Sequence, residues 1–308
     1  MKIGNIELPK GAILAPMAGY TEPGFRAVCS YSGAVMTVTE MISAKGLMYN
    51  GEKTLELLHV SSLEKLCAVQ IFGSDPDIMA EAVKTDYLKK FPIIDINMGC
   101  PVHKVVKVNE GSALMNDINL ACKIVSSVKL AANDRPVTVK FRLGWDEDNK
   151  NFIEFGKRMQ DSGADAITLH SRTRMQFYSG NADIRAWKQL KNAVNIPVIA
   201  SGDIKDKKGF DEACKVVDGV MIGRGALGRP QIFGEILDKD NVLSPMQAVR
   251  MHLGELKKCL DDRTVAVNFR KHAGYYIKGI NGAREIKVLV NQAQSVDEVL
   301  DILSKILD

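Results

Sequence analysis

The sequence predicts an α/β fold, namely a (β/α)8 TIM barrel followed by a small C-terminal all-helical domain. Short apolar strand patterns alternate with amphipathic helix patterns about eight times over the first 240 residues, which is typical of such a barrel and of its usual size. The alternation then stops, and only helix patterns follow. We therefore expect a barrel domain over residues 1–240 and a helical domain over residues 241–308. A doubly wound sheet is the alternative, but the first strand is not followed by a Gly-x-Gly-x-x-Gly turn.

Composition sets the outer bounds. A chain of 308 residues that is 46% hydrophobic can bury one large core and one small one. Its six cysteines form no Cys-x-x-Cys pair and no zinc-finger spacing, so we expect reduced thiols and no metal. A charged N-terminus and the lack of an apolar run of about 18 residues predict neither secretion nor membrane insertion, but a cytoplasmic protein. The net charge of +4 is too small to require a polyanionic partner.

The first two strands and the helix between them are marked by turn residues. The apolar run Ala12–Ala15 stops at a Pro-Met-Ala-Gly turn, and Thr21 with Pro23 begins the helix that follows. The run Ala34–Thr39 is rich in β-branched residues and predicts the second strand. The segment Glu40–Lys45 fits either a strand or a helix.

The third and fourth strands flank a helix with clear start signals. Leu66–Phe72 predicts a strand, after which Asp75 caps a helix that Pro76 opens and that continues to about Lys90. The fourth strand begins at Ile93 and runs into a Gly-Cys-Pro turn, so it delivers polar residues to its C-terminal end.

The second half of the barrel repeats this alternation. A basic, glycine-containing loop is expected at residues 104–115, and apolar residues at three- and four-residue spacing predict the helices that follow it. We predict helices at 120–128, 152–159 and 184–194, and strands at 137–141, 166–169, 198–200 and 220–222.

The helical domain has its own start signals. Ser244 precedes a helix-opening proline, Val265–Lys278 predicts a second helix, and Ser295 with Glu298 forms a capping box for the last one. Between residues 263 and 287 the domain carries six basic residues against one acid, with aromatic residues interleaved. This combination suits phosphates and exposed bases, although a solvated helix face is the alternative. The residues are Arg263, Arg270, Lys271, Lys278, Arg284 and Lys287, with Phe269, Tyr275 and Tyr276.

Polar or functional side chains recur at the C-terminal ends of the predicted strands, where TIM barrels carry their active sites. One such residue is more often a satisfied core group, but nine at the same end indicate a site. They are Met17, Gln70, Asn97, Cys100, Lys140, Arg142, His170, Asp203 and Arg224.

The last two strand ends predict a phosphate site. Ser201, Gly202 and Asp203 follow the seventh strand, and Gly223 and Arg224 follow the eighth. Barrels commonly bind phosphate there through glycine N–H groups and a short helix N-terminus, so a phosphorylated ligand is implied.

Three residues at the barrel mouth have more than one interpretation. Cys100 lies in a turn that exposes a thiol, or it is a structural cysteine of a tight loop. Lys140 is a Schiff-base nucleophile, a cation near a cofactor ring or an ion-pair partner, and His170 is either structural or catalytic. The remaining cysteines fall in strand or helix patterns and are predicted to be buried. They are Cys29, Cys67, Cys122, Cys214 and Cys259.

Motifs that carry a family resemblance are spread over nearly the whole chain. They are Ala15-Pro16-Met17-Ala18-Gly19-Tyr20-Thr21, Gln70-Ile71-Phe72-Gly73, Ile96-Asn97-Met98-Gly99-Cys100-Pro101 with Lys104, Lys140-Phe141-Arg142-Leu143-Gly144-Trp145, His170-Ser171-Arg172-Thr173, and Arg270-Lys271-His272 with Tyr276 and Gly279. In this order they closely resemble the FMN-dependent tRNA-dihydrouridine synthases, and the bacterial B-type branch in particular.

The resemblance implies a role for each matched residue. It places around FMN, from the flavin ring to the ribityl phosphate, the residues Pro16, Met17, Ala18, Gln70, Lys140, His170, Ser201, Gly202, Asp203, Gly223 and Arg224. It places Asn97 and Arg142 at the uracil, and Arg270, Lys271 and His272 on the tRNA. Cys100 matches the proton donor of the family. Ser201 departs from the asparagine of many relatives.

The resemblance also implies the reaction. Specific uridines in the tRNA D-loop would be reduced at C5–C6 to dihydrouridine, by hydride from reduced FMN to C6 and a proton from Cys100 to C5. NADPH, or alternatively NADH, would reload the flavin, and the target base would leave its stack. We expect tRNA and NAD(P)H as the partners of a monomer that binds neither metal nor membrane.

Two other classes of function stay open from the residues alone. One is another barrel enzyme, either a flavin oxidoreductase for a free pyrimidine or a Lys140 Schiff-base aldolase, and the basic aromatic segment disfavours such small substrates. The other is a non-catalytic RNA-binding module, which leaves Cys100 and the phosphate site unexplained.

Overall fold

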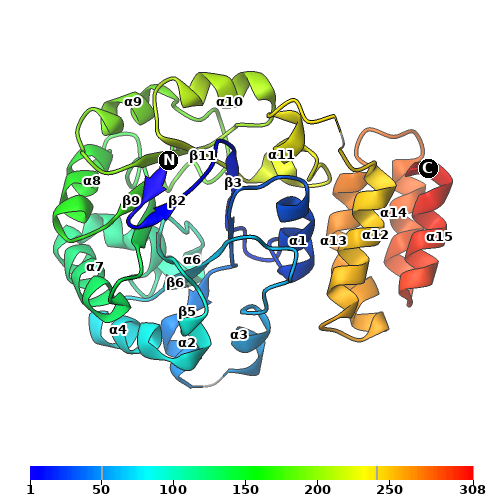
Figure 1. The fold of residues 1–308 in the computed structure, drawn as a ribbon, viewed down its shortest axis with the longest axis horizontal. Coiled ribbons are helices and arrows are strands. Elements are labelled where there is room, and N and C mark those ends of the chain that lie inside the picture. Colours follow the sequence, from blue (N-terminus) through cyan, green and yellow to red (C-terminus); the bar gives the residue numbers. More distant parts are fainter. Residues whose placement is uncertain (50, 241, 308) are drawn as a thin grey trace.

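A computed structural model describes residues 1–49, 51–240 and 242–307 of the chain. It confirms the predicted parallel barrel with helices around it, and a group of helices from the C-terminal part of the chain stands against one side of that barrel (Figure 1). The barrel strands are β3 (Ala12–Leu14), β4 (Thr37–Val38), β6 (Cys67–Phe72), β7 (Ile94–Met98), β8 (Val137–Arg142), β9 (Ala166–His170), β10 (Val198–Ser201) and β11 (Gly219–Ile222).

The strand order closes the ring. Neighbours pair in parallel in the order β3-β11-β10-β9-β8-β7-β6-β4, and a parallel bridge between Ile13 and Met36 joins the two ends. A further strand, β5 (Ile42–Ser43), also pairs with β6. Because all barrel strands are parallel, their C-terminal ends meet on one face of the barrel.

An antiparallel hairpin, β1 (Lys2–Ile3) and β2 (Ile6–Glu7), precedes the barrel. Its Ile3 is fully buried in a cluster with the inward-facing barrel residues Ile13, Met36 and Met221. These residues fill the interior of the barrel. A ligand site is therefore left to the face where the C-terminal strand ends meet.

The helices that surround the barrel, with two 3-10 turns, follow the strands in the predicted alternation. They are α1 (Pro23–Tyr31), α2 (Ala44–Met48), α3 (Glu52–Glu56), α4 (Pro76–Lys84), α5 (Asp86–Lys89), α6 (His103–Val106), η1 (Gly111–Asn116), α7 (Ile118–Ala132), α8 (Phe152–Asp161), α9 (Arg185–Lys191), α10 (Lys207–Cys214), η2 (Arg224–Ala226) and α11 (Ile232–Glu235).

The structure differs from several local predictions. The helix predicted from Pro76 to about Lys90 is two helices, because Thr85 between them has extended backbone angles. The undecided segment after Thr39 contains β5 and the start of α2, and the predicted loop 104–115 contains α6 and η1. Cys29 and Cys67 are buried as predicted, and Cys122 is half-buried. Cys214 and Cys259 are exposed, because they lie at the C-terminal ends of helices, and the prediction is wrong for them.

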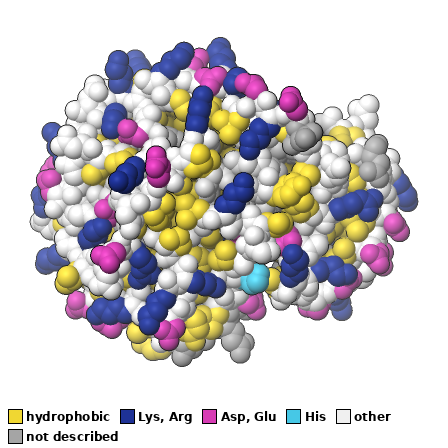
Figure 2. Space-filling view, viewed as in Figure 1, with side chains coloured by type: hydrophobic (Ala, Val, Ile, Leu, Met, Phe, Trp, Pro, Cys, Tyr) yellow, Lys and Arg dark blue, Asp and Glu magenta, His cyan; other side chains and the backbone are white. Residues whose placement is uncertain are grey.

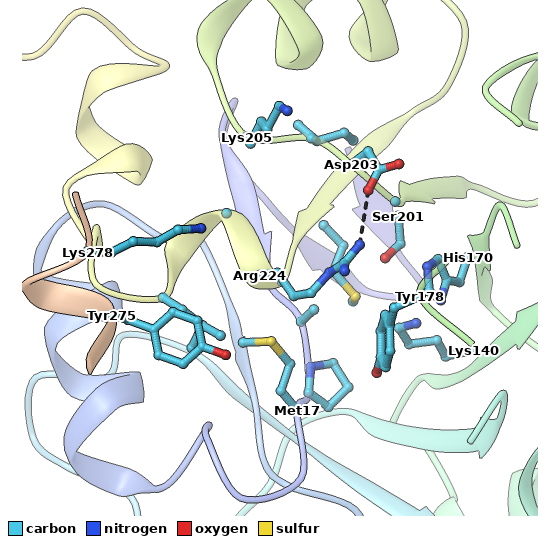
Figure 3. A pocket seen from close by; sticks show the side chains of 18 residues that line it. Met17, Lys140, His170, Tyr178, Ser201, Asp203, Lys205, Arg224, Tyr275 and Lys278 are labelled. Carbon is cyan, nitrogen blue, oxygen red and sulfur yellow. Dashed lines mark hydrogen bonds and ion pairs between the residues drawn. The ribbon is translucent and has the colours of Figure 1, made fainter. Parts of the chain in front are cut away.

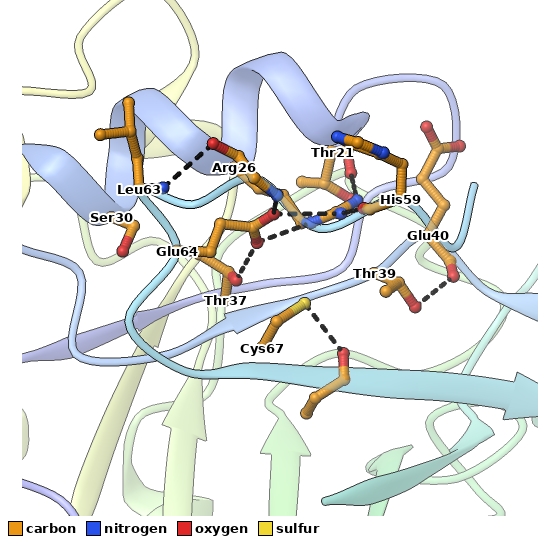
Figure 4. Close-up of polar contacts among 12 residues, drawn as sticks. Thr21, Arg26, Ser30, Thr37, Thr39, Glu40, His59, Leu63, Glu64 and Cys67 are labelled. Atoms are coloured by element: carbon orange, nitrogen blue, oxygen red, sulfur yellow. Dashed lines mark hydrogen bonds and ion pairs between the residues drawn. The ribbon is translucent and has the colours of Figure 1, made fainter. Parts of the chain in front are cut away.

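Helix α1 is tied to the barrel by a buried ion pair (Figure 4). Arg26 Nε lies 3.0 Å from Glu64 Oε2, and both side chains are fully buried. Arg26 also donates to the carbonyl oxygens of Thr21 and His59, while Thr37 of β4 donates to Glu64. A buried charge pair is favourable only when such additional hydrogen bonds are made, and here both partners have them.

The described residues from 242 to 307 form four helices: α12 (Pro245–Lys257), α13 (Asp262–Tyr276), α14 (Ala283–Gln292) and α15 (Val296–Leu307). The start of α12 has a capping box between Ser244 and Gln247. At α15, Ser295 accepts from the Glu298 N–H, but the Glu298 carboxylate accepts from the N–H of Gln294, so half of the predicted capping box is present. The sequence does not predict α14, whose only buried residue is Val290.

The helical domain, which we define as α12–α15, packs directly on α1. Val28 of α1 belongs to its hydrophobic core, beside Val249 and Leu253. A Cβ on Gly24 would lie 2.6 Å from Leu256 Cγ, so this close approach of the two helices requires glycine. The predicted domain boundary between residues 240 and 241 falls in the segment between α11 and α12, and residues 241 and 308 lie outside the described residues.

The charged surface is mixed. On the face seen in Figure 2, Lys and Arg side chains lie over both the barrel and the helical domain, with Asp and Glu side chains between them. None of the described helices is long and apolar enough to cross a membrane.

Candidate active site

Two cavities that share several lining residues open where the C-terminal strand ends meet. The first has a volume of about 510 Å3 and extends along the ends of β10 and β11. The second has a volume of about 430 Å3 and extends along the ends of β6, β7 and β8. Both are lined by Met17, Lys140, His170, Tyr178, Arg224 and Tyr275.

The nine strand-end residues singled out in the sequence all line these cavities. Asp203 lines the first cavity, while Gln70, Asn97, Cys100 and Arg142 line the second. The other four line both. Pro16, Ala18, Ser201, Gly202 and Gly223 also lie at the cavity walls. The structure thus brings together every residue that the resemblance places at the cofactor and the uracil, whereas their individual roles stay predictions.

The loop after β3 reaches the cavities because it folds back on itself. The Met17 N–H donates to Thr21 Oγ1 at 3.0 Å, and the Gly19 N–H donates to the carboxylate of Glu40. Gly19 has a φ of +80°, which glycine adopts without strain. The turn leaves Met17 at the cavity wall.

A chain of hydrogen bonds leads from a buried carboxylate to the cysteine loop. Asp95 Oδ2 accepts from Gln70 Nε2 at 2.6 Å, and Gln70 Oε1 accepts from Asn97 Nδ2 at 2.8 Å. Asn97 Oδ1 then accepts from the backbone N–H groups of Gly99 and Cys100, at 3.1 and 2.9 Å. Asn97 therefore fixes the backbone turn that carries Cys100. Asp95 is absent from the sequence-based site, because one acid inside a strand gives no signal of its own.

Burial dominates the electrostatics of the site. Burial raises the pKa of Asp95 to about 6, although hydrogen bonds from Thr138 and Gln70 oppose this rise. Burial and the nearby Arg142 lower the pKa of Lys140 to about 8. Burial also holds the pKa of His170 well below its usual value, with surrounding cations adding to the effect, so the imidazole is neutral at pH 7.

Arg142 holds the walls of the second cavity. Its Nε donates to the carbonyl of Gly99 at 2.7 Å, and its Nη1 donates to the carbonyls of Thr173 and Phe177, each at 2.9 Å. The guanidinium thus joins the cysteine loop to the loop after β9. Burial raises the pKa of Cys100, and the Val102 N–H and Arg142 only partly oppose this, so the side chain is a protonated thiol at pH 7.

The first cavity offers a glycine cradle at its outer end. A Cβ on Gly202, which has a φ of +131°, would lie 3.0 Å from Ala182 Cβ. A Cβ on Gly225 would lie 2.8 Å from the carbonyl oxygen of Ile204. Only glycine fits these positions without a shift, because the chain packs closely there, and both glycines line the first cavity.

Basic side chains surround this cradle (Figure 3). Arg224 Nη2 lies 3.1 Å from Asp203 Oδ1, and the other oxygen of Asp203 accepts from Arg172 at 2.7 Å. Lys205 and Lys278 line the same cavity, and Lys278 comes from the helical side. Asp203 therefore orients Arg224, and the cations make this end suited to an anionic group.

Sequence reasoning missed one aromatic residue at the centre of the site. The ring of Tyr178 has Arg224 Cζ 4.8 Å from its centroid and Arg142 Cζ 5.6 Å from it. Its loop after β9 has no regular structure, and the only signal was its position beyond a strand end. Tyr275 and Lys278, which the sequence places in the basic segment, line the cavities from the other side.

Part of the predicted RNA-contacting segment is a core. His272 is fully buried, as is Phe269, and Tyr276 is 5% exposed. These side chains pack inside the helical domain or against α1, so the predicted contact of His272 with RNA does not fit its burial.

The two basic residues beside His272 also have partners within the protein. Arg270 Nη2 donates to the carbonyl of Ala293 at 2.8 Å, and Lys271 Nζ lies 3.8 Å from Glu22 Oε2. Arg270 is half-buried, whereas the other cations of the segment are exposed: Arg263, Lys271, Lys278, Arg284 and Lys287.

Comparison with known proteins gives consistent matches. The family model for dihydrouridine synthase matches residues 13–308. A probable tRNA-dihydrouridine synthase of Rickettsia bellii is 39% identical over 303 residues, which cover 94% of this chain and 93% of that protein. The tRNA-dihydrouridine synthase B of Pseudomonas aeruginosa is 39% identical over 314 residues, which cover 96% and 92%.

A solved structure supports the fold alone. An old yellow enzyme homologue from Zymomonas mobilis superposes with a TM-score of 0.56 at 12% identity, over 79% of this chain and 92% of that chain.

Proposed function

Because the chain belongs to the dihydrouridine synthase family, we propose that it reduces uridines of tRNA to dihydrouridine with a bound flavin and NAD(P)H. The observation that carries the proposal is the placement of Cys100, Asn97 and Arg142 on one cavity that continues into a cationic glycine cradle. Membership of this family makes the chain a flavin oxidoreductase. It therefore excludes two earlier alternatives, the Schiff-base aldolase and the non-catalytic RNA-binding module.

We propose FMN as the specific flavin, and residues of both cavities support this choice. The cradle at Gly202 and Gly225, with Arg224 beside it, suits a terminal phosphate, and the buried cation Lys140 suits the polar edge of a ring. Neutral His170 adds a hydrogen-bonding group without further positive charge. When bound, reduced FMN supplies hydride for C6 of the uracil.

The residues of the second cavity handle the proton. Cys100 keeps its proton at neutral pH because burial raises the pKa of its thiol, and a general acid must be protonated before it acts. Asn97 and Arg142 both hold the peptide unit between Gly99 and Cys100, so the backbone that carries the thiol is fixed. In our proposal Sγ–H gives its proton to C5 of the uracil.

Several finer features belong to the same proposal. NADPH serves as the reductant, with NADH as the alternative, and the substrates are specific uridines of the D-loop. The base leaves its stack to reach the second cavity, since a stacked base cannot enter it. The protein acts in the cytoplasm, as a monomer and without a metal. Light scattering and metal analysis of the purified protein test the last two expectations.

The decisive experiment measures the product. Purified, flavin-loaded protein is incubated with NADPH and unmodified tRNA, and dihydrouridine is mapped by mass spectrometry. We expect a mass increase of two hydrogens at defined uridines, absent without NADPH. No product at any uridine, with a flavin that NADPH does reduce, contradicts the proposal and favours a free pyrimidine as the substrate, which the same assay tests with uracil and uridine.

A further inference from the structure

We propose that Glu22 is a positioning residue for tRNA reduction. Through His252 and His272 it holds the cavity loop Met17–Thr21 and the helical domain in one fixed relation. The inference rests on the proposed function, and it gives the Arg-Lys-His motif of α13 a role other than contact with RNA.

The geometry centres on one carboxylate between the two domains. Glu22 precedes α1 at the end of the cavity loop and is 8% exposed. Its Oε1 lies 2.7 Å from Nε2 of His252 in α12. Nε2 of His272 in α13 lies 2.9 Å from the same Oε1 and 3.1 Å from Oε2. Both histidines are fully buried. One side chain of the barrel thus binds two helices of the other domain.

The direction of these hydrogen bonds is set by chemistry. An ionised carboxylate only accepts, so both Nε2 atoms carry a proton. Burial alone would raise the pKa of Glu22, but His272 and His252 together hold it well below its usual value. Lys271 Nζ, 3.8 Å from Oε2, adds a further positive charge.

The second ring nitrogen of each histidine, Nδ1, adds no further hydrogen bond with a described residue to the one that Nε2 makes with Glu22. The Nδ1 atoms of His252 and His272 are buried and have no hydrogen-bond partner among the described residues. A metal ion bound between the three side chains would need each Nδ1–H to meet an acceptor, as metal-binding histidines usually do. No such acceptor is present in the described part of the chain, whereas the three side chains already meet one another at hydrogen-bond distance.

Aromatic contacts carry the link into the cavities. The ring of Tyr20 packs edge-on against His272 and against Tyr275, with centroid distances of 5.7 Å in both pairs. Tyr20 and Met17 line the second cavity, and Tyr275 lines both. A shift of His272 therefore moves the cavity wall and the helical domain together.

Such a link matters because the substrate is large. A tRNA held partly by the helical domain has to bring one base to Cys100, and a misplacement of roughly 1 Å lowers a reaction rate by about 100-fold. Fixing the two domains against each other prevents such a misplacement of the base relative to Cys100.

The test compares two interdomain carboxylates. Glu22→Gln keeps the size of the side chain but removes the negative charge that both histidine N–H groups and Lys271 face. Glu255→Gln is the matched control, because Glu255 Oε2 accepts from Ser61 Oγ at 2.6 Å and joins α12 to the barrel away from the cavity loop. Hydrogen exchange of the resting, flavin-loaded proteins and single-turnover reduction of tRNA are measured for both variants.

We expect Glu22→Gln to exchange faster than wild type over residues 17–26 and 262–276, and to reduce tRNA about tenfold or more slowly. Glu255→Gln should retain wild-type exchange over 17–26 and a rate near that of wild type. Wild-type exchange and rate in Glu22→Gln, or equal losses in both variants, would overturn the proposal.

A second variant covers the case in which Glu22→Gln does not fold. Tyr20→Leu removes the ring between His272 and Tyr275 and leaves the buried carboxylate in place. It should lower the single-turnover rate while the protein remains folded, and a wild-type rate would overturn the link. Hydrogen exchange in the resting protein needs no tRNA. If Glu22→Gln exchanges faster than wild type but wild type makes no dihydrouridine, only the proposed function is contradicted.

Discussion

At the scale of single residues, one buried carboxylate sets the direction of a chain of hydrogen bonds that ends at the backbone N–H of Cys100. Asp95 can only accept when ionised, so Gln70 has to turn its NH2 group toward it and its oxygen toward Asn97. Asn97 then has its own oxygen left for the backbone N–H of Cys100. The orientation of two amides, and with them the cysteine turn, follows from a residue that touches neither the thiol nor the cavity.

The first prediction separates protonation from flavin reduction. Cys100→Ala should accept electrons from NADPH at a rate near that of wild type, because that half-reaction does not use the thiol proton. Reduction of tRNA should slow by roughly 100- to 10,000-fold, the usual contribution of a general acid. Stopped-flow absorbance follows the first step and product mapping the second. Equal losses in both steps would mean that Cys100 supports the fold or the cofactor site.

The second prediction concerns the pH dependence contributed by Asp95. Its pKa is raised from 3.8 to about 6 in the folded state, so folding favours the protonated carboxyl. Its contribution to stability is present below about pH 4 and is lost as pH rises to about 6. The free energy of unfolding of wild type should therefore fall by about 3 kcal/mol relative to Asp95→Asn over this window, at roughly 1.4 kcal/mol per pKa unit.

Urea denaturation at pH 4 and pH 7 measures this difference. The amide introduced by Asp95→Asn can keep its oxygen toward Gln70 while its NH2 group donates to Thr138, so the variant should retain its fold. A difference in stability between the two proteins that does not change with pH would show that Asp95 titrates normally.

At the scale of elements, α13 shows how a sequence pattern can mislead. Basic and aromatic residues alternate along it, which suits an RNA-binding face. However, Val265, Phe269, His272 and Tyr276 are spaced by four, three and four residues, and all are buried. That spacing is the stripe of an amphipathic helix and predicts a core face. The composition of the segment does not show on which face of the helix each residue lies. Only the angular positions around the helix separate the core face from the surface face.

The third prediction tests how α1 is held. Glu64→Gln leaves Arg26 charged and buried without its ion-pair partner, so stability should fall by about 3–5 kcal/mol. Glu81→Gln is the control, because it breaks an exposed ion pair with Lys84 and should cost less than about 1 kcal/mol. Denaturant unfolding of the three proteins measures both values. Similar losses in the two variants would argue against a special role of the buried pair.

The fourth prediction concerns η2, the 3-10 turn that follows β11. Arg224→Ala removes the cation beside the glycine cradle and should lower the affinity for FMN by at least about tenfold, because a charge-assisted contact to phosphate is lost. Lys208→Ala, an exposed change of the same charge on α10, is the control. Equilibrium dialysis with FMN measures both. Unchanged binding in Arg224→Ala would place the phosphate elsewhere in the cavities.

At the scale of the whole molecule, the barrel and its active face follow from the sequence, whereas the packing between domains does not. Alternating patterns fix the strand ends, and parallel strands place all of these on one face, so the residues around Cys100 could be grouped without coordinates. The contact of Glu22 with His252 joins residues that are far apart in the chain and carries no periodic signal. The same holds for Tyr178, which enters the site from an irregular loop.

The fifth prediction addresses the grip on tRNA. Arg284→Ala with Lys287→Ala removes two exposed cations of the helical domain that do not line the cavities. Affinity for tRNA should fall and its salt dependence should flatten, since each neutralised phosphate releases counterions. Lys123→Ala with Lys208→Ala, on α7 and α10, is the charge-matched control. Binding titrations at several salt concentrations measure the slopes, and FMN content should stay unchanged in both.

Equal slopes for the two double variants would mean that these cations are an ordinary solvated face. In that case helix α6 and its C-cap, which carry the exposed Lys104 and Lys107 beside the cysteine turn, become the next candidate for the RNA contact.

The sharing of α1 between two cores also has a consequence for synthesis on the ribosome. Val28 is made early but finds its neighbours Met246 and Val249 only when the last quarter of the chain has emerged. At about 5–20 residues per second, the outer face of α1 stays uncovered for roughly 10 to 40 s. During that interval the nascent barrel presents an apolar surface, and the helices that follow act as the cover that completes it.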